Sequence, residues 1–169
     1  MMADIEIKGL KELYDQLQQL PVNIEKNVMR GALRASAKVI QAEAQRRAPE
    51  APPSSVAAKK YGATPGELKR SIRVSVFVKA GTVMARIRAG NKKAFYARWV
   101  EFGTAPHEER PKNHKSLFLA GVFREQVNHP GAKMHPFMRP AFDGEWRSAV
   151  DAAAEYIRAR LPKEFGKLL

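Results

Sequence analysis

The sequence contains no cysteine, which excludes both a disulfide framework and a thiolate metal site. It has no apolar run near the roughly 18 residues that a membrane-spanning helix requires, and its first residues lack the basic and apolar regions of a signal peptide. We therefore expect a soluble intracellular product with no membrane partner. The chain is 169 residues long and 44% hydrophobic, which suits a single domain with a substantial core.

The motifs of common enzyme classes are also absent. The sequence has no G-x-S-x-G elbow, no phosphate-binding P-loop and no dinucleotide-binding glycine pattern. The string HEERPKNH does not match the helical H-E-x-x-H zinc motif, because no histidine follows at the required offset. Surface positions in loops are therefore a better interpretation than a zinc site for the four histidines, which are His107, His114, His129 and His135.

Three carboxylates, Glu101, Glu108 and Glu109, lie close to the aromatic-rich strings of the sequence. A general acid–base pair needs two carboxylates in divergent environments. The lysines and arginines around these three instead favour ordinary ion pairing. We expect no catalytic residue, no bound metal and no cofactor, so the protein is not predicted to be an enzyme.

Positive charge is abundant and unevenly distributed. The formal net charge is +13, and residues 51–140 carry seventeen lysines and arginines against five acidic residues, which accounts for +12 of it. Such a field favours a polyanion or an acidic protein partner, although it could simply keep the surface soluble. No helix-turn-helix, zinc-finger or basic-zipper signature is present, so only contacts to a nucleic acid backbone stay open.

Helical periodicity marks both ends of the chain. Leucines recur at helical spacing over residues 9–20, and an apolar stripe over residues 22–48 predicts a long helix that ends before Pro49. The stripe comprises Val28, Ala32, Ala35 and Val39, with Met29, Leu33 and Ile40 alongside. A last helix is predicted over residues 142–161, with one apolar face formed by Phe142, Trp146, Val150, Ala153 and Ile157.

Residues 71–89 give the clearest strand signal. Two runs with a period of two, SIRVSVFV and TVMARIRA, flank a short turn and predict an antiparallel hairpin. Its apolar face is expected to pack on the long helix, whereas Arg73, Arg86 and Arg88 share the opposite face. Together with Lys92 and Lys93, these arginines are our candidates for contact with a partner or a neighbouring subunit.

Several shorter elements complete the predicted architecture. We expect an edge strand at residues 5–7, a short helix over 94–102 and two small strands around Ala120-Gly121. Residues 49–66, rich in Pro, Ala, Ser and Gly, predict a mobile loop, and the polar segment 105–134 is expected to project from the core. The fold class is α+β: a single domain over 1–169, with a small antiparallel sheet packed against the long helix and the C-terminal helix.

Three strings, taken in order, resemble the signature of one family. YARWVEFGT (residues 96–104) is similar to Y-A-x-x-V-E-F-G-T, and HPGAKMHPFMRPAFD (129–143) is similar to H-P-G-x-x-x-x-P-F-L-R-P-A. Upstream, RRAPE and TPGELKRSIRV resemble A-P-x-x-T-G-x-L-x-x-S-I. The family comprises the tail-completion, or neck, proteins of long-tailed bacteriophages and prophages. The signature residues are Tyr96, Glu101, Phe102, Gly103, Pro130, Gly131, Pro136, Phe137, Arg139 and Pro140.

The resemblance covers most of residues 10–160, with two departures. The loop at 49–66 is longer than the usual spacing, and Met138 replaces the usual leucine, a change that preserves volume. Pro136 and Pro140 fix the backbone and remove donors, which gives a rigid entry to the last helix, and Gly103 and Gly131 permit turns that other residues resist. The large aromatic residues of the strings are expected to lie in the core; they are Trp99, Phe137, Phe142 and Trp146.

The resemblance implies a structural virion protein that is assembled in the host cytoplasm. Such a protein forms a ring, usually a hexamer, at the head–tail junction. It joins the tail tube or tail terminator to the head-completion connector protein, and it surrounds the passing DNA without sequence specificity. The polar segment between the strings can then reach a neighbouring subunit. The alternatives are a ring like that of a tail terminator and a free, non-specific DNA-binding protein.

Overall fold

The computed structural model describes residues 10–18, 21–50, 62, 64–111, 116–119 and 121–166. The expected strand at residues 5–7 and most of the expected loop at 49–66 lie outside these ranges, so both stay predictions. The helices are α1 (Leu10–Gln18), α2 (Val22–Arg47), α4 (Glu67–Ser71), α5 (Ala97–Phe102) and α6 (Met138–Phe165). The strands are β1 (Arg73–Lys79), β2 (Thr82–Arg88), β3 (His107–Glu109), β4 (Leu117–Leu119), β5 (Val122–Arg124) and β6 (Val127–His129).

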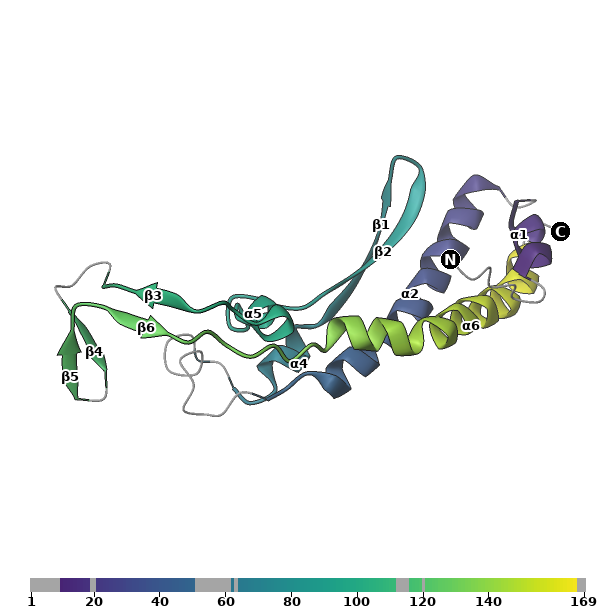
Figure 1. Ribbon diagram of the computed structural model, residues 1–169. Helices are drawn as coiled ribbons and strands as arrows, with labels where there is room; N and C mark the ends of the chain where they lie inside the picture. Colours follow the sequence, from purple (N-terminus) through teal and green to yellow (C-terminus); the bar gives the residue numbers. More distant parts are fainter. Residues whose placement is uncertain are drawn as a thin grey trace.

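The α+β class is confirmed, with one difference in the sheet. Among the described residues the strands form three separate two-stranded antiparallel ladders, β1–β2, β3–β6 and β4–β5, instead of one small sheet. The reason is position: β3 to β6 lie in an extension away from the β1–β2 hairpin and contact mainly one another (Figure 1). As Figure 1 shows, the ladders extend from the helices in different directions.

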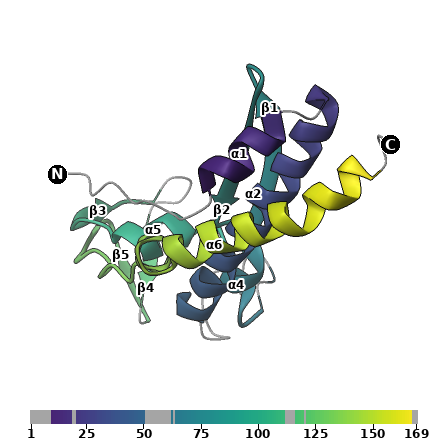
Figure 2. The same ribbon diagram turned by 90° about the vertical axis from the view of Figure 1, so that its right-hand side faces the viewer.

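The packing of α2 against α6 forms one of two core clusters. α6 lies across α2, and α1 covers the end of this pair (Figures 1 and 2). The buried residues of the cluster are Leu13, Leu17, Val28, Ala32, Ala154, Ile157 and Leu161. Gly31 permits the close approach of the two helices, because a methyl group there would overlap the hydroxyl of Tyr156. Small residues at this crossing thus let the helix backbones approach.

The buried positions of α2 differ from the predicted stripe. Val28, Ala32 and Ile40 are buried as expected, whereas Ala35 and Val39 are only half-buried, and Ala37 and Ala44 are buried instead. The cause is that α2 contacts α6 along one side and the β1–β2 hairpin along another. A helix covered on two sides does not present one simple apolar face.

A second core cluster lies where the other end of α2 meets α4, α5 and the start of α6. It contains Ala44, Ala48, Leu68, Ile72, Ala94, Ala97, Phe137 and Ala141. The Ser71 hydroxyl donates to the Leu68 carbonyl (2.7 Å) and accepts from the Gly90 N–H (2.9 Å), which ties the two ends of the hairpin together. The helix α4 was not predicted, because five residues are too few to show helical periodicity.

The predicted β1–β2 hairpin is confirmed. Its register pairs Arg73 with Arg88 and Ser75 with Arg86, so the three arginines share one face, as expected. The opposite, apolar face lies toward α2, which contacts both strands. Coverage is incomplete near the turn, where Val78 is 37% exposed.

The strands β3 to β6 form an extension that we call the arm. β3 pairs with β6 through His107↔His129 and Glu109↔Val127, and the β4–β5 hairpin forms its tip. Figure 1 shows the arm running away from the helices, with its tip at the opposite end of the molecule from the C-terminal end of α6.

Candidate functional site

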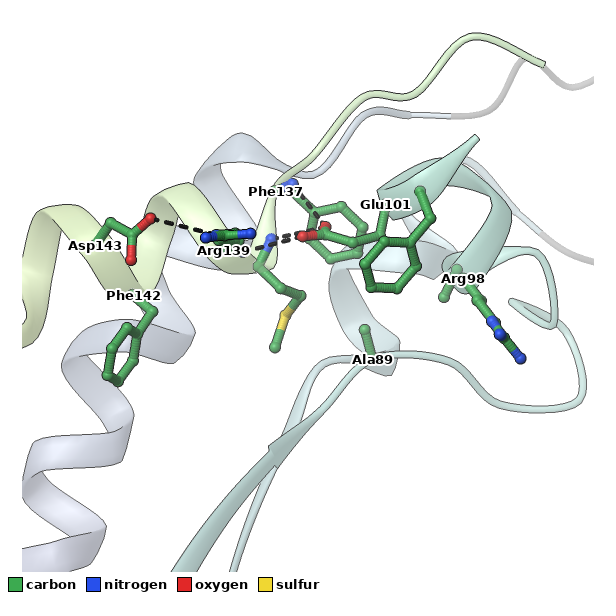
Figure 3. A pocket seen from close by; sticks show the side chains of 10 residues that line it. Ala89, Arg98, Glu101, Phe137, Arg139, Phe142 and Asp143 are labelled. Atoms are coloured by element: carbon green, nitrogen blue, oxygen red, sulfur yellow. Dashed lines mark hydrogen bonds and ion pairs between the residues drawn. The ribbon is translucent and has the colours of Figure 1, made fainter. Parts of the chain in front are cut away.

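A buried carboxylate joins the two family strings. Glu101 of α5 is 8% exposed, and its oxygens accept hydrogen bonds from the backbone N–H groups of Phe137 (2.8 Å), Met138 (2.9 Å) and Arg139 (3.0 Å). These are first-turn donors of α6, which has no side-chain cap of its own. A negative charge there also interacts favourably with the helix dipole. Glu101 therefore caps α6 from a distant segment (Figure 3).

This finding corrects the expectation of ordinary ion pairing for Glu101. Glu108 does pair with Arg110 (2.8 Å), as expected, whereas the neighbour of Glu109 is the imidazole of His107 (3.5 Å) instead of a lysine or arginine. Glu101 instead satisfies backbone donors. The only signal in the sequence was that Glu101 and the Pro136–Pro140 string belong to the same family signature.

Two glycines allow the strings to run side by side. Thr104 and Ala132 exchange backbone hydrogen bonds of 3.0 and 3.2 Å, next to Gly103 (φ 70°) and Gly131 (φ 87°). A Cβ on Gly103 would lie 2.7 Å from the Ala132 carbonyl oxygen, and one on Gly131 would overlap the Thr104 carbonyl. Both positions therefore require glycine for conformation and for space.

The remaining signature residues surround this contact, which we call the signature junction (residues 96–104 and 130–143). Pro140 lies in the first turn of α6, where a missing N–H costs little. Burial and, secondly, the negative charge of Glu67 raise the pKa of the Tyr96 hydroxyl.

The signature residues differ in exposure. Phe137 is fully buried, whereas Phe102 is 73% exposed and the Arg139 side chain 86% exposed. Pro130 and Pro136 are exposed. Part of the signature thus serves folding, and part of it faces outward.

An apolar groove runs along the exposed side of the junction. One pocket of about 570 Å³ is bordered by Ala89, Arg98, Phe102, Met138 and Phe142. A second, of about 550 Å³, is bordered by Ile40, Trp146 and Val150. Phe142 and Asp143 line both pockets, so the two lie side by side, and we call them together the apolar groove. Figure 3 shows Phe142 and the Arg139–Asp143 pair at its α6 side.

Two of the four aromatic residues expected in the core are not there. Phe137 is confirmed as fully buried, but Trp99 is 50% and Phe142 55% exposed, and Trp146 is half-buried. The buried side of α6 carries small residues such as Ala141 and Ala149, and the large rings of this helix lie beside that side. Trp99 instead packs edge-on against Phe95, with ring centroids 5.4 Å apart.

The candidate basic residues lie on the hairpin and on the loop after it. Arg73 donates to the Gly90 carbonyl (3.1 Å), and the Arg86 guanidinium lies 4.8 Å from the centre of the Phe77 ring. The Asn91 side chain accepts from the backbone N–H groups of Lys93 and Ala94 and holds the loop in place. Within the described ranges, no carboxylate forms an ion pair with any member of the basic surface, which comprises Arg73, Arg86, Arg88, Lys92 and Lys93.

Three of the four histidines lie in the part of the chain that the structure describes. His107 and His129 stack across the arm with ring centroids 5.0 Å apart, His135 is exposed before α6, and His114 lies outside the described residues. No group of three or more His, Asp or Glu side chains suited to a metal ion occurs in the part of the chain that the structure describes. None of the helices described there is both long and apolar enough to cross a bilayer.

Comparison with known families identifies the chain more directly. Residues 11–103, more than half of its length, match the model of the HK97-gp10-like family, described as "Bacteriophage HK97-gp10, putative tail-component". No curated protein and no solved structure matches the chain. The matched region ends at Gly103 and so includes all but the last residue of the first string of the signature junction, which supports the resemblance to phage tail and neck proteins. The chain therefore belongs to the HK97-gp10-like family and is a structural component of the bacteriophage tail, and hence of the virion.

Proposed function

We propose that this tail component forms a ring at the neck of the particle. The ring completes the end of the tail, joins it to the head-completion connector protein and surrounds the path of the DNA. The observation that carries the proposal is that large aromatic side chains are exposed on this member of a phage tail family. Trp99, Phe102, Phe118, Phe123 and Phe142 are each at least 50% exposed. Exposed apolar patches of this kind mark protein–protein contacts.

The positions of these aromatic side chains favour a ring of subunits over a symmetric dimer. Phe118 and Phe123 lie at the arm tip, whereas Phe102 and Phe142 border the apolar groove. Two different surfaces on one subunit support head-to-tail association, and such association closes into a ring when the rotation between subunits permits it. Six subunits are the number that the family resemblance implies.

The basic surface is suited to contact with acidic partners. Its arginines are exposed and carry no ion pair among the described residues, so their charge is available to the tail tube, to a tail terminator or to the connector. Charge complementarity mainly sets specificity and the rate of encounter. DNA that slides through the ring requires weak, salt-sensitive contacts rather than tight binding.

The proposed role requires no reaction at the signature junction. The one buried carboxylate there, Glu101, is occupied by three backbone donors. Among the described residues, no buried polar side-chain atom lacks a hydrogen-bond partner. The arrangement is therefore that of a folded structural element and supports a non-enzymatic role.

Deletion of the gene from its phage or prophage tests the proposal. We expect filled heads and separate tails of normal length, and addition of the purified protein should join them. Tails that grow beyond normal length would favour the terminator-like alternative, and normal infectious particles would contradict both.

A titration with duplex DNA tests the remaining alternative. We expect weak binding whose affinity falls steeply as salt rises. Tight, salt-resistant binding would favour a free DNA-binding protein over a neck component.

A further inference from the structure

We propose that the arm tip of one subunit inserts Phe118 and Phe123 into the apolar groove of a second copy of this chain. The inference rests on the proposed ring and specifies the contact that closes it. The donor side is an unusual feature of the fold. Phe118 and Phe123 are cross-strand partners in the β4–β5 hairpin, with ring centroids 5.0 Å apart and exposures of 65% and 71%.

The tip lacks the packing that normally stabilises such a hairpin. β4 and β5 have three residues each and make their main contacts with one another. An isolated two-stranded hairpin is marginally stable in water, so a partner surface is needed to hold two large rings in place. The arm also carries the tip away from the helices of its own chain (Figure 1). The partner surface is therefore expected on another copy.

The acceptor side has suitable chemistry. The larger pocket of the apolar groove has a volume of about 570 Å³ and is bordered by Phe102 and Phe142, which are 73% and 55% exposed. Aromatic rings prefer edge-to-face or offset contacts with other rings, and exposed rings on both sides permit them. Tip and groove lie on different parts of the subunit, so their contact can repeat head to tail around a ring.

Charges of opposite sign lie near the two surfaces, although the tip also carries the exposed Arg124. Glu125 lies two positions after Phe123 and is exposed at the tip. The groove is flanked by the exposed guanidinium groups of Arg98 and Arg139, and the ion pair of Arg139 with Asp143 is long, at 3.8 Å. A tip that brings Glu125 toward Arg98 would thus gain an ion pair as its rings enter the groove.

The size of one contact indicates that several insertions must act together. Two phenylalanine side chains bury roughly 300–500 Å² together, whereas a standard stable interface buries about 800 Å² on each partner. One insertion alone is therefore a weak link. In a closed ring every subunit donates one tip and accepts another, so the insertions support one another.

The first experiment compares ring formation by the wild-type protein and by the double variant Phe118→Ser/Phe123→Ser, in solution and on tails that lack the protein. Because both rings are exposed, the melting temperature of the monomer should stay unchanged. We expect the concentration needed for rings to rise about tenfold or more, as for loss of a binding hot spot. Tyr14→Ser removes a ring of similar exposure (56%) on α1 and should have no effect. Equal loss in this control would overturn the proposal.

The second experiment identifies the two surfaces directly. Since the chain has no cysteine, Phe123→Cys subunits mixed with Phe142→Cys subunits should form a disulfide-linked pair on oxidation. In the same way, Glu125→Arg and Arg98→Glu should each impair rings, and subunits with both changes should recover them. Two results would refute this contact and leave the neck ring standing, provided that the wild type forms rings. One is the absence of a cross-link between the cysteine variants, and the other is full ring assembly by Phe118→Ser/Phe123→Ser. A wild-type protein that forms no ring on tails would refute both.

Discussion

Glu101 accepts a hydrogen bond from the backbone N–H of Phe137 at 2.8 Å, across 36 positions of sequence. The carboxylate and the buried ring work together. Glu101 fixes the first turn of α6, and Phe137 fills the cluster beneath it. The start of α6 and the end of α5 are thereby held in one arrangement, on which the outward-facing Phe102, Arg139 and Phe142 depend.

Loss of this cap should destabilise the fold. Glu101→Ala leaves three backbone donors without their acceptor, and we expect a loss of about 2–3 kcal/mol in the free energy of unfolding. Glu101→Gln retains one acceptor oxygen and should lose less. Urea denaturation measures both variants. Glu109→Gln, on the exposed surface of the arm, is the control; the prediction fails if its effect equals that of Glu101→Ala.

Buried and exposed aromatic residues of the two family strings should contribute differently to the free energy of unfolding. Phe137→Ala removes a fully buried ring, and we expect a loss of about 3–5 kcal/mol in unfolding free energy. Trp99→Ala should cost much less, because half of its side chain is exposed. Thermal and urea unfolding of the two variants provide the comparison. Equal losses would mean that Trp99 is buried in solution.

Replacement of glycine by alanine should change the stability of the fold in opposite directions at two positions. Gly131→Ala places a methyl group against the Thr104 carbonyl at a positive φ, and it should destabilise by roughly 1–3 kcal/mol. Gly144→Ala lies inside α6 with no atom within 4 Å of the added methyl group, and it should stabilise by about 0.5–1 kcal/mol. Melting temperatures that move in the same direction for both variants would contradict this account of the junction.

The Glu43 carboxylate predicts a dependence of stability on acid. The hydrogen bond from Arg46, followed by that from Arg47, lowers its pKa from 4.5 to about 2. Because the folded-state pKa is depressed, the contribution is complete above the unfolded value and is lost as pH falls from about 4.5 toward 2. Melting curves across this range should show a smaller acid-induced loss for Glu43→Gln than for wild type. Parallel curves would show that these ion pairs contribute nothing measurable.

Regular periodicity made much of the fold predictable. The long helix, the β1–β2 hairpin and its arginine face follow from spacing in the sequence, and they are found as expected. The exposure of Phe142 was not predictable, since it depends on the alanines that bring α6 close to α2. The cap by Glu101 joins residues far apart in the chain, and the apolar groove exists only once α2, α5 and α6 are packed. Spacing within one segment carries no information about either.

The most direct test of the neck assignment is joining of purified heads and tails that lack this protein, with infectious particles as the readout. Wild-type protein should restore joining. Arg86→Glu/Arg88→Glu, which reverses two exposed charges of the basic surface, should fold normally and fail to join them. Arg34→Glu/Lys38→Glu on the exposed side of α2 reverses the same amount of charge and should join normally. No joining by the wild type, or equal joining by Arg86→Glu/Arg88→Glu, would contradict the account.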